Sequence, residues 1–440
     1  MKFTKTLIAA SLAVMSADTF AAAFQLAEQN ASGLGRAYAG EAAVADDASV
    51  VARNPALMSI FKENQLSVAG IAVIPDVSLR GTQASNSSVN PSQLNDSSIA
   101  PAAFVPAGYF VMPIDDKFAV GFGAFSNFGL STEFEADYPA GQLAGETEIV
   151  TVNMNVSGSY KINEQFSVGL GLNYVYADAK IVRNFGATSE QTQAQFDQLS
   201  QAGLLPPDFR VPSQAEAVHL EGDDYGFGWN IGGMYQFGEN SRFGFNYRSE
   251  TDITFEGEFS SQLPVGLGVG SGGASLPGRV EITLPAIAEF SGSHQLDEKA
   301  GLHYSVLWTG WSSFQKLQAD VDGRDEPGFS KNENFSNSMR YSIGGDYQFN
   351  DAVLLRAGLA YDESPADKNH MSISIPDTDR FWYSFGANYT MSEQANLDIG
   401  MSILRGKTQN FTESDNQGQQ WGFESKGHAV LIGAQYNYTF

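Results

Sequence analysis

The sequence predicts an all-β protein: a 14-stranded antiparallel transmembrane β-barrel with an N-terminal plug. Three observations predict this fold. Apolar and polar residues alternate along many segments, the connections between these segments alternate between short and long, and an export signal opens the chain. Successive side chains of a strand point to opposite faces, so such segments can present one face to lipid and the other to a polar lumen.

The first 22 residues have the pattern of a secretory signal peptide, with cleavage expected within positions 21–23. Lys2 and Lys5 supply the positive end, and residues 6–15 form a short apolar stretch. Small residues follow at Ala21, Ala22 and Ala23, as a cleavage site requires. Because the apolar stretch is too short to span a bilayer, it predicts export and not a membrane anchor.

Residues 23–64 are expected to form the plug, and residues 65–440 the barrel. The segment before the barrel is rich in Ala, Gly and Ser and lacks sustained alternation, so it could also be a periplasmic tail or a linker. About eight strands already give an interior that side chains just fill, so fourteen strands enclose a wider lumen. An empty lumen would leak water and solutes, which favours the plug.

The alternation is clearest in residues 150–160. One face carries apolar residues and the other carries small polar ones, namely Val150, Val152, Met154, Val156, Gly158 and Tyr160 against Thr151, Asn153, Asn155, Ser157 and Ser159. The pattern recurs in residues 166–176, 227–237, 341–349 and 381–389, with aromatic residues near the ends of the stripes. Aromatic rings are typical of strand ends at a membrane interface.

Short and long connections follow one another along the barrel. The short ones are 113–117, 161–165, 238–241, 294–299, 350–351 and 392–395. The long ones are 75–100, 128–147, 183–221, 260–278, 310–334, 363–379 and 406–427. Tight periplasmic turns and long external loops are typical of transmembrane barrels. A soluble β-sandwich is the alternative, but it explains neither this asymmetry nor the export signal.

Composition argues against several classes of function. The formal net charge of −25 opposes a nucleic-acid partner, because phosphate binding requires basic surface. There is no cysteine, none of the five histidines forms an H-x-x-x-H pair, and no G-x-S-x-G motif occurs. Gly268, Gly270 and Gly273 match dinucleotide-binding spacing but lie in a Gly/Ser-rich loop. We therefore expect no enzyme activity, no cofactor and no metal site.

Two long connections carry unusually many apolar residues. These are Phe196, Leu199, Leu204 and Leu205 in 183–221, and Leu263, Val265 and Leu267 in 260–278. Exposed loops rarely carry so much apolar surface without a partner. The residues could simply pack against one another. We favour an external hydrophobic groove that first captures an amphipathic molecule.

Basic residues are scarce, with 25 Lys and Arg against 50 Asp and Glu. Lys180 and Arg183 close the fifth predicted strand, and Lys331 is placed in the loop before the tenth. By spacing alone, such residues are solvated charges at the barrel rim. A carboxylate buried in an apolar lumen would, however, require one or two of them as partners.

At this point the sequence resembles a known family, the FadL family of outer-membrane long-chain fatty acid transporters. The matching runs are Phe24-Gln-Leu-Ala-Glu28, Ser32-Gly-Leu-Gly-Arg-Ala-Tyr-Ala-Gly-Glu41, Ala45-Asp-Asp-Ala48, Arg53-Asn-Pro-Ala-Leu57, Ser126-Asn-Phe-Gly-Leu130, Gly226-Phe-Gly-Trp-Asn230, Tyr247-Arg-Ser-Glu250 and Ile373-Ser-Ile-Pro-Asp-Thr-Asp-Arg-Phe-Trp382. The likeness covers essentially the whole mature chain. The external loops 183–221 and 260–278 depart from the family pattern and share little beyond apolar character.

The resemblance implies a set of site residues. The inner pocket would hold the fatty acid carboxylate through Arg183 and Lys331, with Glu333 nearby and Phe24 and Ile181 beside them. Ser126, Asn127 and Gly129 would lie at an inward kink of the third strand that opens the wall sideways, and Asn54, Pro55 and Ala56 form the hatch motif. Passive uptake would then run from the external groove through the pocket to lateral release. A diverged branch of the family carries aromatic hydrocarbons, which is the alternative substrate class.

We expect a multi-pass protein of a Gram-negative outer membrane, in contact with its lipid and lipopolysaccharide, and a monomer. Two other classes remain as alternatives. A general porin would need an open, charged constriction, which liposome swelling with sugars would reveal. A lipid-hydrolysing barrel would need a nucleophile and a base, for which His294 near Ser291 and Ser293 is a pattern without context. A role of the long loops as a phage receptor or adhesin is compatible with transport.

Overall fold

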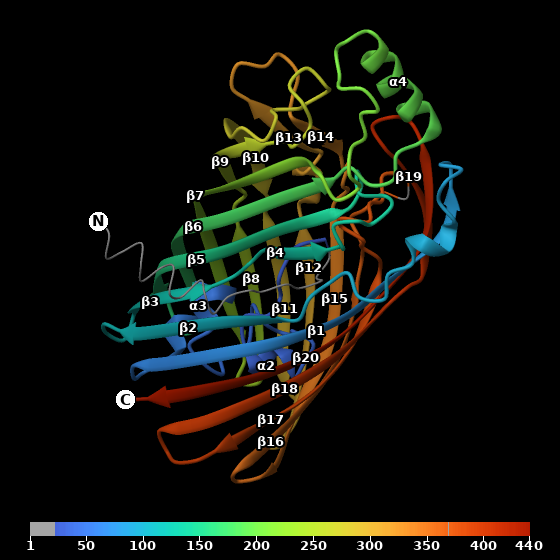
Figure 1. Cartoon of the computed structure of the whole chain (residues 1–440). Helices are drawn as coiled ribbons and strands as arrows, with labels where there is room; N and C mark the ends of the chain where they lie inside the picture. Colours follow the sequence, from blue (N-terminus) through green and yellow to red (C-terminus); the bar gives the residue numbers. More distant parts are fainter. Residues whose placement is uncertain (1–22, 368) are drawn as a thin grey trace.

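The computed structural model describes residues 23–367 and 369–440, so the predicted signal peptide lies outside the described residues. Strands wind around a single lumen, and the segment before the first strand lies inside it (Figure 1). Within the described residues, no helix is long and apolar enough to cross a membrane.

In the described part of the chain, three short helices precede the barrel and one longer helix lies in an external connection. The helices are α2 (Ala31–Leu34), α3 (Val50–Arg53), the 3-10 helix η1 (Pro55–Ile60) and α4 (Glu190–Gln201), with short 3-10 turns η2 (Pro91–Leu94) and η3 (Trp311–Ser313). The strands are β1 (Gln65–Ala84), β2 (Ala103–Pro113), β3 (Phe118–Phe125), β4 (Gly129–Glu133), β5 (Gly145–Lys161), β6 (Phe166–Asn184), β7 (Glu216–Phe237), β8 (Ser241–Arg248), β9 (Thr251–Ser260), β10 (Leu276–Leu284), β11 (Ile287–Gln295), β12 (Ala300–Thr309), β13 (Lys316–Val321), β14 (Phe329–Asn332), β15 (Ser338–Asn350), β16 (Val353–Asp362), β17 (Arg380–Thr390), β18 (Ala395–Gly406), β19 (Gln409–Ser414) and β20 (Gln420–Thr439).

These strands make up a closed antiparallel barrel of fourteen spans in the described part of the chain, which confirms the predicted fold class. Eight spans are single strands, and six consist of two strands in line, such as β3 with β4 and β14 with β15. The barrel closes between the first and last strands, where Gln65 pairs with Thr439 and Ala84 with Trp421 (Figure 1). Closure removes the sheet edges, as a membrane requires.

The alternation predicted from the sequence appears as two faces of the wall. Along β5, Val156 is 54% exposed on the outside, whereas Asn155 is 2% exposed on the inside. Large rings are exposed next to the short turns, among them Phe166, Phe237, Phe349 and Tyr389. The six predicted short connections each overlap a turn at this end of the barrel. Their aromatic residues form the expected interfacial girdle.

The predicted long loops are partly wrong. β4, β13, β14 and β19 all lie inside segments expected to be loops, and β1 continues to Ala84. The strands extend beyond the apolar band because neighbouring backbones keep pairing there, and side-chain polarity gives no sign of this. Lys331 accordingly lies on β14, not in a loop as predicted.

The plug (residues 23–64) is buried against the inner wall, with α2 and α3 inside the barrel in Figure 1. Its backbone approaches the wall so closely that glycine is required there. A Cβ atom at Gly358 of β16 would overlap the Arg36 carbonyl, and one at Gly244 of β8 would overlap the Ala42 carbonyl. The segment 23–64, which lacks the alternation of a strand, therefore lies within the lumen.

Candidate ligand-binding lumen

The third span of the barrel is interrupted. β3 ends at Phe125 and β4 begins at Gly129, so residues 126–128 break the strand. β3 pairs with β2 and β5, whereas β4 pairs only with β5 among the described strands. The stretch of β2 from Ala103 to Ala107 consequently has a partner on β1 alone. The structure thus places Ser126 and Asn127 in a break of the wall and Gly129 at its edge.

The start of the plug pairs with this break. The Gly129 N–H donates to the Phe24 carbonyl at 2.8 Å, and the Leu26 N–H donates to the Asn127 carbonyl at 2.7 Å. The Ser126 hydroxyl donates to the Thr151 carbonyl of β5 at 2.6 Å. The first residues of the plug therefore satisfy backbone groups that the interrupted strand leaves open.

Beside the break lies an apolar cavity. It is lined by Phe24, Leu130, Ile149, Ala179, Ile181, Leu220, Phe255, Phe314, Ile375 and neighbouring residues. Phe24 packs edge-on against Trp311 and Phe314, with ring centroids 4.5 and 5.2 Å apart. Two of the predicted pocket residues, Phe24 and Ile181, are thus brought together here. The lining suits an alkyl or aromatic group.

A second, polar cavity of about 320 Å³ contains the two predicted cations. Arg183 of β6 and Lys331 of β14 both line it, although 147 positions separate them in the chain. Glu413 of β19, Met371 and Phe329 also line it. The predicted pocket is therefore divided into an apolar cavity and a polar cavity.

The two cations have different partners. Arg183 is 4% exposed and donates to the carbonyls of Glu146 and Val182 at 3.0 and 2.8 Å. Its third bond, at 3.0 Å, goes to the Ser374 hydroxyl, so in the described residues only uncharged oxygens accept hydrogen bonds from its guanidinium. An anion could replace these acceptors with a stronger, charge-assisted bond.

Lys331 is already paired with a carboxylate. Its ammonium group donates to Glu413 and to the Ser372 hydroxyl. Glu333, the third predicted member of this group, is 2% exposed and lies outside the residues that line the polar cavity.

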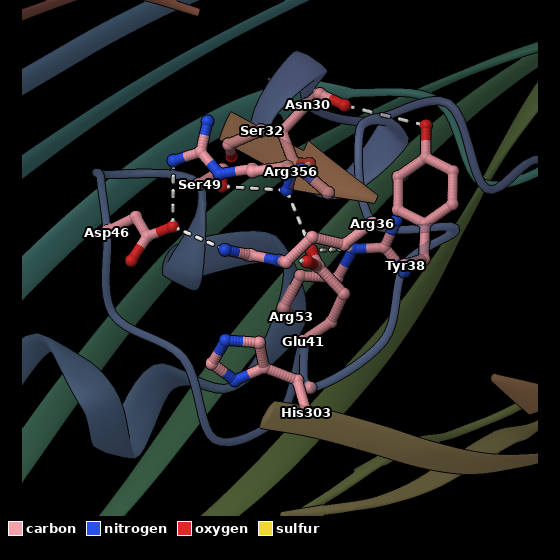
Figure 2. Close-up of polar contacts among 12 residues, drawn as sticks. Asn30, Ser32, Arg36, Tyr38, Glu41, Asp46, Ser49, Arg53, His303 and Arg356 are labelled. Carbon is pink, nitrogen blue, oxygen red and sulfur yellow. Dashed lines mark hydrogen bonds and ion pairs between the residues drawn. The ribbon is translucent and has the colours of Figure 1, made fainter. Parts of the chain in front are cut away.

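A network of charged residues fastens the plug to the wall (Figure 2). Asp46 of the plug lies between Arg36 of the plug and Arg356 of β16, with N–O distances of 2.6 and 3.1 Å. Arg356 also pairs with Asp398 and lies 3.6 Å from Asp346. Burial alone would raise the pKa of Asp46, but Arg36 and Arg356 hold it below its ordinary value.

The hatch motif residues lie at a second anchoring point. Asn54 donates to the Ala42 carbonyl at 2.7 Å and to the Gly233 carbonyl of β7 at 3.0 Å. Its side-chain oxygen accepts the Ala56 N–H at 3.1 Å and caps η1, which Pro55 opens. The motif thus joins two turns of the plug to the wall.

The predicted external groove residues lie together only in part. Phe196 and Leu263 are buried in one cluster, with Leu205 and Leu267 packed against it. Leu199 lies half-buried on α4, while Leu204 and Val265 are 71% and 80% exposed. The loops therefore pack against each other, as in the alternative interpretation, and still present apolar side chains outward.

Nothing in the sequence indicated the residues that are hydrogen-bonded to the two cations. Ser372 and Ser374 border or belong to the recognised run 373–382, but they received no role. Glu413 lies in a predicted loop and carried no signal. The charged network around Arg356 and Asp398 was also missed, because single charges on separate strands form no local pattern.

A closed barrel with a plug, and with an apolar cavity beside a polar one in its lumen, defines a class of plugged outer-membrane barrels. Residues 12–440 match the family model described as outer membrane protein transport protein (OMPP1/FadL/TodX). The chain belongs to this family, as the resemblance indicated.

Relatives are similar along their whole length. The long-chain fatty acid transport protein of Escherichia coli (strain K12) is 40% identical over 452 residues, covering 100% of this chain and 99% of that protein. The 47 kDa outer membrane protein of Pasteurella multocida (strain Pm70) is 43% identical over 448 residues, with coverage of 100% and 99%. A solved Pseudomonas aeruginosa FadL homologue has the same fold, with a TM-score of 0.81 at 22% identity, covering 95% of this chain and 100% of that one. The chain is an outer-membrane protein, and its E. coli relative is a long-chain fatty acid transport protein.

Proposed function

We propose that this protein carries long-chain fatty acids passively across the outer membrane. The observation that carries the proposal is the pair of cavities: Arg183 and Lys331 beside a cavity lined by Phe24, Ile181 and Ile375. A fatty acid has the same two parts, a carboxylate and an alkyl chain. The fatty acid transport protein of E. coli, 40% identical over its length, supports this substrate class.

The proposed route has three stages and uses no nucleotide. A fatty acid first binds the apolar loop surface around Phe196, Leu199, Leu204, Leu205, Leu263, Val265 and Leu267, near lipopolysaccharide. It then enters the two cavities, where burial of the chain contributes about 0.8 kcal/mol per methylene. Movement of the plug near Phe24 releases it through the wall break at residues 126–128 into the membrane. One chain supplies every residue of this route, so we propose that it acts as a monomer.

Aromatic hydrocarbons are the alternative substrate. They would occupy the apolar cavity but have no group that could bind Arg183, whose hydrogen bonds in the described residues go to uncharged oxygens. A buried guanidinium without a counter-charge is costly. The polar cavity therefore favours an acid as the ligand.

Ligand binding to the purified protein in detergent tests this proposal. We expect saturable binding of labelled oleate, weaker binding of oleyl alcohol and no binding of toluene at the same concentration. Binding of toluene without oleate would instead support the hydrocarbon alternative. Sugar-driven swelling of liposomes that contain the protein would support an open porin.

A larger side chain in the apolar cavity tests where the alkyl chain lies. Ala179 of β6 lines this cavity, so Ala179→Phe should shorten the room available. We expect weaker binding of oleate, by about 0.8 kcal/mol for each methylene excluded, and unchanged binding of octanoate. Isothermal titration with both acids measures the difference. An equal loss for both acids would mean that the chain lies elsewhere.

A further inference from the structure

One protein carboxylate already occupies the place where a ligand carboxylate is expected. Glu413 of β19 is 7% exposed and pairs with Lys331 through one oxygen. Its other oxygen accepts the Ile373 N–H at 2.9 Å. Among the described residues, Lys331 forms its ion pair with Glu413, whereas no ion pair involves Arg183. Of the two cations in the polar cavity, Lys331 is thus paired with a carboxylate of the protein, whereas Arg183 is bonded only to uncharged oxygens in the described residues and can take an anion.

The bonds around these cations also hold the segment 371–375. Ser372 binds Lys331, Ile373 binds Glu413, and Ser374 binds Arg183. Met371 at one end lines the polar cavity, and Ile375 at the other lines the apolar cavity. The segment therefore connects the two cavities, and the groups that fix it are those that a ligand carboxylate would use.

The same segment is bonded to the wall beside the break. The Thr132 hydroxyl of β4 donates to the Ser374 carbonyl at 2.9 Å, and the Ser374 hydroxyl donates to the Leu143 carbonyl at 2.7 Å. β4 begins directly after residues 126–128, which interrupt this span of the wall. Ser374 is consequently in direct contact with the interrupted span.

We propose that Glu413 competes with a ligand carboxylate for Lys331. When the ligand carboxylate binds Lys331, it displaces Glu413 and thereby frees the segment 371–375. The inference rests on the proposed function and adds the residue that selects acids. Exchange of one carboxylate for another keeps Lys331 compensated. A neutral head group that displaced Glu413 would leave the partly buried ammonium of Lys331 without a counter-charge, which is unfavourable. The polar cavity is large enough to hydrate Glu413 after it moves.

The substitution Glu413→Gln tests the competition. It keeps the shape of the side chain and removes the charge that the ligand must displace. We expect oleate to bind about tenfold more tightly, because the ion pair with Lys331 becomes a weaker hydrogen bond between the ammonium group and an uncharged amide oxygen. Binding of oleyl alcohol should not change. Glu424→Gln on β20, at a partly exposed carboxylate beside Arg80, is the matched control and should leave both affinities unchanged.

A second measurement follows the segment itself. Hydrogen–deuterium exchange of residues 371–375 in the wild-type protein should increase with oleate and not with oleyl alcohol. If Glu413→Gln does not fold, Glu413→Asp shortens the reach to Lys331 and Ile373 and should change oleate affinity in the same direction. Folding is checked by the heat-dependent gel shift of the barrel.

The outcomes separate this inference from the proposed function. If the wild type binds oleate and Glu413→Gln leaves this affinity unchanged or weakens it, only the role of Glu413 is overturned. Equal tightening of oleyl alcohol overturns it too, since it would show a looser pocket without selection for acids. If oleate does not alter the hydrogen–deuterium exchange of residues 371–375, the release of this segment is overturned. Absence of oleate binding in every variant overturns the proposed function.

Discussion

Removing the charges of Arg183 and Lys331 is expected to abolish tight binding of fatty acids. In Arg183→Gln, a guanidinium whose acceptors are uncharged is lost, and the ligand loses its strongest partner. Hydrogen bonds to charged groups contribute about 1.5–3 kcal/mol each, so the affinity for oleate should fall about tenfold to a hundredfold. The double variant with Lys331→Gln should lose at least about a hundredfold. Titration with labelled oleate measures both changes.

The controls for this prediction distinguish charge from shape. Arg405→Gln removes an exposed cation on β18 and should leave oleate binding unchanged. Oleyl alcohol should bind the double variant as it binds the wild type, because it has no carboxylate to lose a partner. If oleate affinity is unchanged in the folded Arg183→Gln variant, the head group does not reach the polar cavity.

Removing Arg356 is expected to loosen the plug and make the barrel permeable. Arg356 lies among Asp46, Asp346 and Asp398, so Arg356→Met leaves Asp398 without this cation and leaves Asp46 and Asp346 paired with Arg36 of the plug. Breaking a buried pair by removing one partner typically costs about 3–5 kcal/mol. The plug residue Asp46 should then detach from the wall, and liposomes containing the variant should swell faster in sugar solutions.

A matched variant tests whether the position matters. Arg80→Met removes a cation that is 72% exposed and should alter neither swelling nor thermal stability. Asp46→Asn keeps the shape of the plug side chain but weakens the same link, so its permeability should lie between those of the wild type and Arg356→Met. Swelling at the wild-type rate in Arg356→Met would show that other contacts, such as those of Asn54, are sufficient to hold the plug.

The sequence by itself determined the barrel. Alternation such as Asn155 beside Val156 is visible in any single strand, because the side-chain period of two is local. The short turns were found for the same reason, since each lies between two such stripes. The buried segment 23–64 also followed from a simple size argument about the lumen.

Only the tertiary structure decided how the site is arranged. Arg183, Lys331 and Glu413 lie on three strands that come together across the lumen, and no local pattern reports that Lys331 is compensated while Arg183 has only uncharged acceptors. The split into an apolar and a polar cavity depends equally on which segment, here 371–375, lies against them. Periodicity records which face a residue occupies, whereas ion pairs depend on the closure of the barrel and the position of the plug within it.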